Sequence, residues 1–243
     1  MTQNDIPNRK FAAFDIDGTL FRSGLYREVL FELMRRDLIP QKIMKVVTPK
    51  MEAWQKRLHD DAFESFETAL IGMFDKEVPH LKVSDFDDAA RVVLEKMSDN
   101  VYVYTRDLIK QLKAEGYYLI AISGSQEDLV EPFAKKYGFD YWVGQKWTRS
   151  EEYFTGEIVK THTGKDLILL GIIEEQNLTV QDSYAIGDSN GDSGMFRIAE
   201  HVIAFNPTRE LYEKARENGW KIVIERKGVI YQLEPENGSH VLA

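Results

Sequence analysis

Two aspartates, Asp15 and Asp17, stand one residue apart in the stretch FAAFDIDGTLF. The apolar run before them is typical of a buried β-strand. In α/β proteins, functional side chains gather beyond the carboxyl ends of such strands. The pair is therefore the first candidate for a catalytic or metal-binding site, and the question is what the rest of the chain brings to it.

Further polar residues follow two other apolar runs. Ser123 and Gly124 come at the end of YYLIAIS, while Asp188 and Asp192 belong to GDSNGD, which follows SYAI. Lys165 begins a helical stretch after a glycine turn. Because parallel strands have their carboxyl ends at one edge of a sheet, these groups are expected to converge on Asp15 and Asp17.

The chemistry of this set favours a magnesium ion and a phosphate group. Asp15 and Asp188 would repel each other as anions, and a hard divalent cation with oxygen ligands removes that repulsion. Mg²⁺ commonly takes one or two protein carboxylates and completes its shell with water and substrate phosphate. The hydroxyl of Ser123, the backbone N–H of Gly124 and the charge of Lys165 would hold the phosphate.

The elements that must position these residues fall into two parts. From residue 25 to about residue 100, apolar side chains recur at helical spacing without a convincing strand. From about residue 101, strand and helix patterns alternate, which is typical of a parallel sheet covered on both faces. We therefore expect a doubly wound α/β core formed by residues 1–24 and 101–243, with a helical cap, residues 25–100, inserted after the first strand.

Several local signals refine this picture. Ser125 and Asp128 have the spacing of a capping box at the start of a helix. Pro49 is expected to end a short helix, because proline breaks a helix interior. Residues 222–233, IVIERKGVIYQL, could form a terminal hairpin, and residues 237–243 look like a loose tail.

The composition excludes some classes of partner and site. A formal net charge of -9 and a pI near 5.2 argue against a nucleic-acid partner, since phosphate backbones are bound by basic surfaces. The chain has no cysteine, hence no disulfide and no thiolate metal site. Its first residues are polar, and no apolar run approaches the ~20 residues needed to span a bilayer. We expect a cytoplasmic protein with no membrane partner.

The motifs in their order resemble one family. Asp-x-Asp-Gly-Thr-Leu, Ser-Gly after an apolar strand, a lone lysine and Gly-Asp-x-x-x-Asp are similar to the haloacid dehalogenase superfamily, whose members are mostly Mg-dependent phosphatases. The resemblance covers the core from residue 11 to about residue 219. The helical insertion resembles the cap of the subgroup that includes phosphoserine phosphatase. It implies a Rossmann-like core, a Mg²⁺ cofactor and a small phosphorylated metabolite as substrate.

The resemblance also implies a role for each catalytic residue. Asp15 would be the nucleophile that forms an aspartyl-phosphate, and Asp17 the general acid and then the general base. Ser123 and Gly124 would bind the transferring phosphoryl oxygens. Lys165 would neutralise charge on Asp15 and the phosphate.

The same resemblance implies the metal ligands. Asp15, the backbone carbonyl of Asp17 and Asp188 would bind Mg²⁺, with Asp192 holding a water molecule on the metal. Lys160 competes with Lys165 for the lysine position, and Lys165 is favoured because a helix follows it.

The cap offers a weaker candidate, Arg57, which could contact an acidic group of the substrate, although an arginine on a helix is more often a surface charge. Residues 25–60 contain eight Lys or Arg and five Asp or Glu, whereas residues 61–100 contain four and ten. The first half of the cap is therefore the better candidate to face an anion. Two solvated faces of different charge are the simpler interpretation.

Departures from the subgroup's pattern limit the prediction of a substrate. Phosphoserine phosphatases have a glutamate that contacts the substrate amine where this chain has Gly24, and their last motif reads Gly-Asp-Gly-x-Asn-Asp rather than GDSNGD. Phosphoserine is therefore not the expected substrate. The leading function is phosphomonoester hydrolysis. The alternatives are a phosphotransferase or mutase, and a signalling domain phosphorylated on aspartate. A true dehalogenase is disfavoured because a halide leaving group needs neither Asp17 nor a metal.

Overall fold

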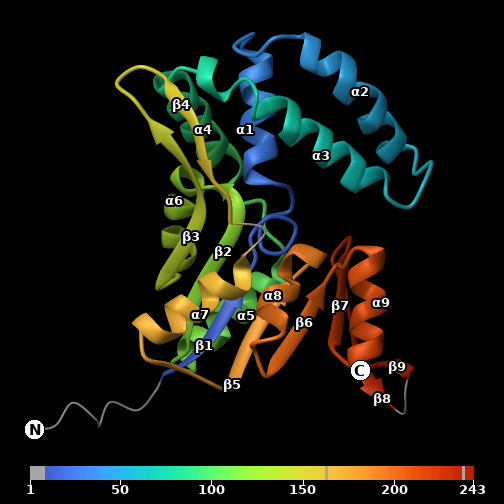
Figure 1. The fold of residues 1–243 in the computed structure, drawn as a ribbon. Coiled ribbons are helices and arrows are strands. Elements are labelled where there is room, and N and C mark those ends of the chain that lie inside the picture. Colours follow the sequence, from blue (N-terminus) through green and yellow to red (C-terminus); the bar gives the residue numbers. More distant parts are fainter. Residues whose placement is uncertain (1–8, 162–163, 237–238) are drawn as a thin grey trace, which may run out of the picture. The chain divides into compact units, whose positions relative to one another are not determined.

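A computed structural model describes residues 9–161, 164–236 and 239–243 (Figure 1). Its contacts divide the chain into two compact units. The core unit contains the described residues up to Gly24, Ser98–Gln145 and the described residues from Lys160 onward. The helical unit contains Leu25–Met97 and Lys146–Val159.

The core unit is built on a mainly parallel β-sheet. Its strands are β1 (Arg9–Phe14), β2 (Tyr118–Gln126), β3 (Tyr141–Arg149, leaving the core unit after residue 145), β5 (Leu178–Gly187), β6 (His201–Phe205), β7 (Lys221–Arg226), β8 (Val229–Glu236) and β9 (Ser239–Leu242). They follow one another across the sheet in the order β3-β2-β1-β5-β6-β7-β8-β9. Only the β7–β8 and β8–β9 pairs of the core sheet are antiparallel. The predicted α/β fold class is confirmed.

Helices cover both faces of this sheet. Successive residues of a strand point to opposite sides, so the apolar side chains of a strand need cover on both faces. Phe11 and Ala13 belong to a buried cluster that includes side chains of α7 (Lys165–Glu175), α8 (Ser193–Phe196) and α9 (Arg209–Asn218). On the opposite face, Phe14 packs edge-on against Phe139, which follows α6 (Glu127–Tyr137). On that face Phe205 also stacks on a tyrosine of α5 (Val103–Ala114). The central strand β1 therefore needs the continuous apolar run that precedes Asp15.

The end of the chain forms more structure than its sequence predicts. The hairpin expected over residues 222–233 is confirmed, since β7 and β8 pair with Ile222 opposite Leu233. The loose tail is wrong for residues 239–242, which form β9 and pair with β8. A short segment gains backbone hydrogen bonds from an open sheet edge even when its own apolar pattern is too brief to predict a strand. Residues 237 and 238 lie outside the described residues.

The helical unit contains α1 (Leu25–Arg35), α2 (Lys42–Gln55), α3 (Ala62–Phe74), the short helix η1 (Val78–His80), α4 (Val83–Met97), and β4 (Phe154–Val159) paired with the end of β3. The hairpin, residues 146–159, groups with these helices, whereas the sequence placed it in the core. The reason is aromatic packing. The ring of Trp147 contacts Tyr26, Phe74 and Phe86, with centroids 5.4–5.9 Å apart.

The prediction that a short helix ends near Pro49 is wrong, because this residue lies inside α2. The helix continues beyond Pro49 to Gln55 and packs within the helical unit. Trp54, near the end of α2, stacks on Phe66 of α3 at a centroid distance of 5.2 Å. Among the helices of the described residues, none is both long enough and apolar enough to cross a membrane.

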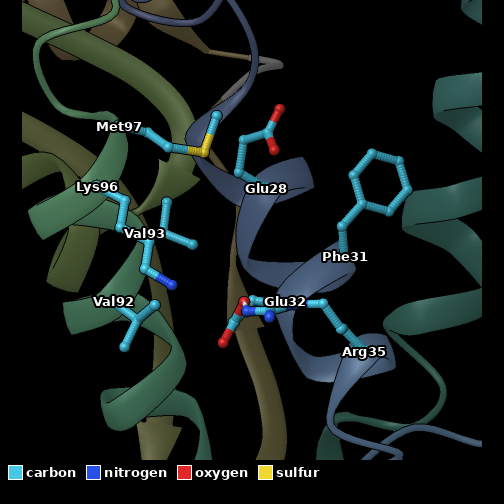
Figure 2. A pocket seen from close by; sticks show the side chains of 8 residues that line it. All are labelled: Glu28, Phe31, Glu32, Arg35, Val92, Val93, Lys96 and Met97. Carbon is cyan, nitrogen blue, oxygen red and sulfur yellow. Dashed lines mark hydrogen bonds and ion pairs between the residues drawn. The ribbon is translucent and has the colours of Figure 1, made fainter.

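A small hollow of about 170 Å³ lies between α1 and α4 (Figure 2). It is lined by both charged and apolar side chains, which include Glu32, Arg35, Val93 and Lys96. Glu32 is only 8% exposed and forms ion pairs with Arg35, the last residue of α1, and with Arg36, which follows it. Its charge is thus balanced by arginines at the end of the same segment.

Candidate active site

The carboxyl edge of the core sheet brings six of the predicted site residues together. They come from the segment after β1, from the end of β2, from the start of α7 and from the segment after β5. These residues are Asp15, Asp17, Ser123, Lys165, Asp188 and Asp192. The backbone N–H of Asp15 also donates to the carbonyl of Ile186, 2.9 Å away, so the β1 end is tied to β5.

Lys165 is the only cation among these six residues. Its Nζ lies 2.7 Å from Asp15 Oδ1 and 2.7 Å from Asp192 Oδ1, and the residue is 5% exposed. Burial lowers the pKa of Lys165, but the two carboxylates outweigh that effect and hold its pKa above the usual value. Lys165 therefore stays charged and links the motif of Asp15 to the motif of Asp192.

Asp15 is in an environment that disfavours its own charge. Burial, assisted by the negative charges of Asp192 and Asp17, raises the pKa of the Asp15 carboxyl to about 7, while Lys165 opposes the rise. Its Oδ2 atom is buried and has no hydrogen-bond partner within the described part of the chain. A buried carboxylate oxygen without a partner is costly. This one is suited to receive an additional positive or electrophilic group.

Three carboxylates form a group that fits a divalent cation. One oxygen each from Asp15, Asp188 and Asp192 lies within 4.8 Å of the others. Gly18 makes room for this group: a Cβ atom there would lie 2.1 Å from Asp188 Oδ2, and its φ of +84° also favours glycine. Oxygen ligands with an excess of negative charge match the preference of a hard divalent cation.

Both carboxylate oxygens of Asp192 accept hydrogen bonds from the protein. Its Oδ2 accepts the backbone N–H groups of Asp188 and Ser189, both at 3.1 Å, and its Oδ1 accepts from Lys165. The residue is 1% exposed. Asp192 thus fixes the turn that carries Asp188.

Asp17 is directed toward hydroxyl groups rather than toward the other carboxylates. Its Oδ2 accepts hydrogen bonds from Ser123 Oγ at 2.6 Å and from Ser125 Oγ at 2.8 Å. The side chain is outside the group of three carboxylates described above. Ser123 is fully buried, and its carbonyl accepts from the hydroxyl of Thr161 at 2.6 Å. The two aspartates that are one residue apart in the motif therefore have different hydrogen-bond partners.

A comparison with protein families decides the family of this chain. The profile described as haloacid dehalogenase-like hydrolase matches residues 12–197, a span that contains the whole cluster. The chain belongs to the haloacid dehalogenase-like hydrolase family. The family predicted from the motif order is confirmed.

Two curated relatives of this haloacid dehalogenase-like hydrolase match nearly their whole length. A histidinol-phosphatase of Neisseria meningitidis serogroup C is 25% identical over 224 residues, which are 88% of this chain and 98% of the relative. A phosphoserine phosphatase of Methanocaldococcus jannaschii is 27% identical over 210 residues, covering 85% and 90% of the two chains. Their names refer to two different phosphorylated compounds.

Solved structures support the same fold. A Bordetella pertussis protein of unknown function has a TM-score of 0.69 at 18% identity, covering 90% of this chain and 99% of the other. A phosphoserine phosphatase determined as an analogue of its phospho-aspartyl intermediate has a TM-score of 0.61 at 23% identity, covering 90% and 94%. The fold of each of these two structures thus covers 90% of this chain.

Sequence reasoning missed Ser125 as a site residue and assigned it to a capping box. That assignment is wrong: β2 continues to Gln126, which is the residue before α6 and makes no side-chain capping bond. The Ser125 hydroxyl instead donates to Asp17. A signal was present, because residues two apart in a strand share a face, and Ser123 and Ser125 are so spaced.

Three further residues were predicted as candidates, namely Gly124, Lys160 and Arg57. Gly124 lies within β2 between the two serines. Lys160 is exposed, whereas its competitor Lys165 holds the position beside Asp15. Arg57 belongs to the helical unit, is exposed and has a left-handed backbone with φ of +52°.

Proposed function

We propose that this hydrolase is a Mg²⁺-dependent phosphatase that cleaves a small phosphomonoester through a phosphorylated Asp15. The observation that carries the proposal is the buried Asp15 carboxylate, which Lys165 holds through one oxygen and whose other oxygen has no hydrogen-bond partner among the residues that the structure describes. The class of enzyme expected from the sequence, a phosphoric monoester hydrolase, is confirmed by the family and by the named phosphatases among its relatives.

The two aspartates divide the reaction between them. Asp15 attacks phosphorus, so that a bond from its carboxylate oxygen to phosphorus forms while the bond to the leaving alcohol breaks. Asp17 gives its proton to the oxygen of that alcohol. In the second half, Asp17 takes a proton from water and the water oxygen attacks phosphorus. The bond between Asp15 and phosphorus then breaks, which frees the Asp15 carboxylate and releases inorganic phosphate.

The other residues of the cluster bind charge. Lys165 offsets the negative charge of Asp15 and of the phosphoryl group, and Ser123 and the backbone N–H of Gly124 donate to phosphoryl oxygens. These contributions match the demands of phosphoryl transfer, in which positioning and charge stabilisation dominate.

Asp15, Asp188 and the backbone carbonyl of Asp17 would hold the magnesium ion, and Asp192 would act on it through water. Asp192 fits the indirect role because both of its oxygens already accept hydrogen bonds from the protein. When bound, the ion supplies positive charge that aligns and neutralises the phosphoryl group. The excess of three carboxylates over one lysine explains why such a charge is needed.

The substrate is proposed to be a small phosphorylated metabolite. The relatives named histidinol-phosphatase and phosphoserine phosphatase both act, by their names, on compounds that combine a phosphate with an amine. In the helical unit Arg57 is the candidate contact for an acidic group of the substrate. A net charge of -9 gives the chain no basis for binding a nucleic acid.

The test is phosphate release from a panel of phosphorylated metabolites and one aryl phosphate. We expect turnover that requires Mg²⁺, stops in EDTA, and is lost in Asp15→Asn while the thermal unfolding transition is retained. Adding an acceptor alcohol distinguishes hydrolysis from transfer, because a phosphotransferase forms a new ester in place of inorganic phosphate. Steady turnover by Asp15→Asn would refute the proposal.

A further inference from the structure

Two serine hydroxyls donate to the same oxygen of Asp17. Ser123 and Ser125 both reach Oδ2, at 2.6 and 2.8 Å. The serines are also connected to each other, since the backbone N–H of Ser125 donates to Ser123 Oγ at 2.9 Å. Each of the two residues is at most 2% exposed.

The number of hydrogens makes the two serines unequal during the reaction. A serine hydroxyl has one hydrogen and can donate it to one acceptor at a time. In the proposed function Ser123 donates to a phosphoryl oxygen, and it cannot then also donate to Asp17. Ser125 is not needed by the phosphoryl group and keeps its hydrogen bond to Asp17.

The backbone around Ser125 is held in place by the neighbouring strand. A Cβ atom on Gly144 of β3 would lie 2.6 Å from the N and Cα atoms of Glu127 and 2.9 Å from the carbonyl oxygen of Ser125. The chain between Ser125 and Glu127 therefore approaches β3 as closely as a glycine allows. A hydroxyl on such a fixed backbone can orient a partner at little entropic cost.

We propose that Ser125 is a positioning residue for Asp17, holding Oδ2 throughout the reaction so that Oδ1 carries the proton given to the leaving alcohol. The inference rests on the proposed function and deepens it. In the first step the proton leaves Oδ1 for the alcohol oxygen as the phosphorus–oxygen bond breaks. In the second step a proton of the attacking water returns to Oδ1. Because Oδ2 keeps accepting the hydrogen bond from Ser125, it is a poorer position for that proton than Oδ1.

The test compares esters that differ in their need for a proton. An aryl ester such as p-nitrophenyl phosphate releases a stable anion, whereas an alkyl phosphate requires protonation of its leaving oxygen. We expect Ser125→Ala to lower kcat/KM for the alkyl ester about tenfold or more and for p-nitrophenyl phosphate less than about threefold. Ser125→Thr retains a hydroxyl and should restore the alkyl activity. Inhibition by inorganic phosphate should be unchanged.

Ser183→Ala is the matched control, because Ser183 is fully buried in the same unit and its hydroxyl accepts from the Glu200 backbone, away from the site. It should affect both esters equally and little. Thermal unfolding checks that each variant folds, and Ser125→Gly replaces Ser125→Ala if that variant does not.

Equal losses for both esters in Ser125→Ala, or weaker inhibition by phosphate, would overturn the positioning role and leave the proposed function intact. A wild-type protein that hydrolyses neither ester nor any member of the metabolite panel would instead refute the proposed function.

Discussion

Lys165 determines the charge balance of the site. It is buried and contacts Asp15 and Asp192 at 2.7 Å, so its removal leaves two carboxylates without a counter-charge. Lys165→Met is expected to lower kcat/KM by about 10³-fold, the size typical of lost electrostatic stabilisation. Steady-state kinetics measure the loss. Lys110→Met, at an exposed lysine of α5, is the control and should remain near wild type, and comparable losses in the two variants would contradict the assignment.

The raised pKa of Asp15 should make the stability of the metal-free protein depend on pH. Its pKa is about 7 in the folded state against an ordinary value of 3.8. A carboxyl whose pKa is raised on folding contributes stability that is present below the unfolded value and lost as the pH rises through the folded value. In EDTA, the midpoint of thermal unfolding should therefore fall mainly between about pH 4 and about pH 7. Asp15→Asn should show a smaller fall, and identical pH profiles would argue against the raised pKa.

For individual residues, the sequence predicts which side chains belong to the site better than it predicts which groups they contact. The motifs predict Asp15, Asp17, Ser123 and Lys165, because polar residues that follow buried strands or open a helix at the carboxyl edge of a parallel sheet are typical of a functional site. The role of Ser125 could not be predicted in the same way. Its spacing to Asp128 fits a helix cap as well as its spacing to Ser123 fits a strand face, and only the length of β2 decides between them.

Among the elements, the contact between β3 and the start of α6 is the one most sensitive to a single atom. Gly144→Ala would place a Cβ 2.6 Å from backbone atoms of Glu127 and must shift either β3 or the Ser125 segment. We expect the free energy of unfolding to fall by about 1–3 kcal/mol. Catalytic activity should fall by more than the decrease in folded protein accounts for. Chemical denaturation and kinetics on the same preparation measure both.

Gly72 provides the matched control for this prediction. It lies inside α3, and a Cβ there would meet nothing within 4 Å. Gly72→Ala should therefore stabilise the protein by about 0.5–1 kcal/mol, since alanine is the better helix former. If Gly144→Ala were as harmless as Gly72→Ala, the close approach would have no consequence for the site.

Periodicity predicted most elements correctly, because the apolar faces of the buried strands and helices are long. It failed for α2 and for β9, where packing partners rather than local pattern decide. Trp54 stacks on Phe66 beyond the proline that should have ended α2, and β9 pairs along the edge of β8.

For the whole molecule, the division into two units shows where sequence reasoning reaches its limit. The change from helical to alternating patterns predicted an inserted helical part after β1. It could not predict that the hairpin 146–159 groups with that part, because the signal is the packing of Trp147 against rings from distant helices.

Metal binding should be visible as a change in the stability of the whole protein. A ligand that binds only the folded state adds about 2.7 kcal/mol at a concentration one hundred times its Kd. Mg²⁺ should therefore raise the unfolding midpoint, and Asp188→Asn should abolish the rise by removing one of the three carboxylates. A midpoint insensitive to Mg²⁺ in the wild type, with calcium and zinc as comparisons, would contradict the proposed cation site.

Acid quenching during turnover, followed by peptide mass spectrometry, shows whether Asp15 carries the phosphoryl group. Digestion with pepsin at acidic pH, at which an acyl phosphate survives, gives peptides that span Asp15 and Asp17, and fragmentation distinguishes the two residues. We expect one added phosphoryl group on Asp15, present only with substrate and Mg²⁺. Phosphate on any other residue, or an unmodified peptide in a quenched reaction that is turning over rapidly, would contradict it.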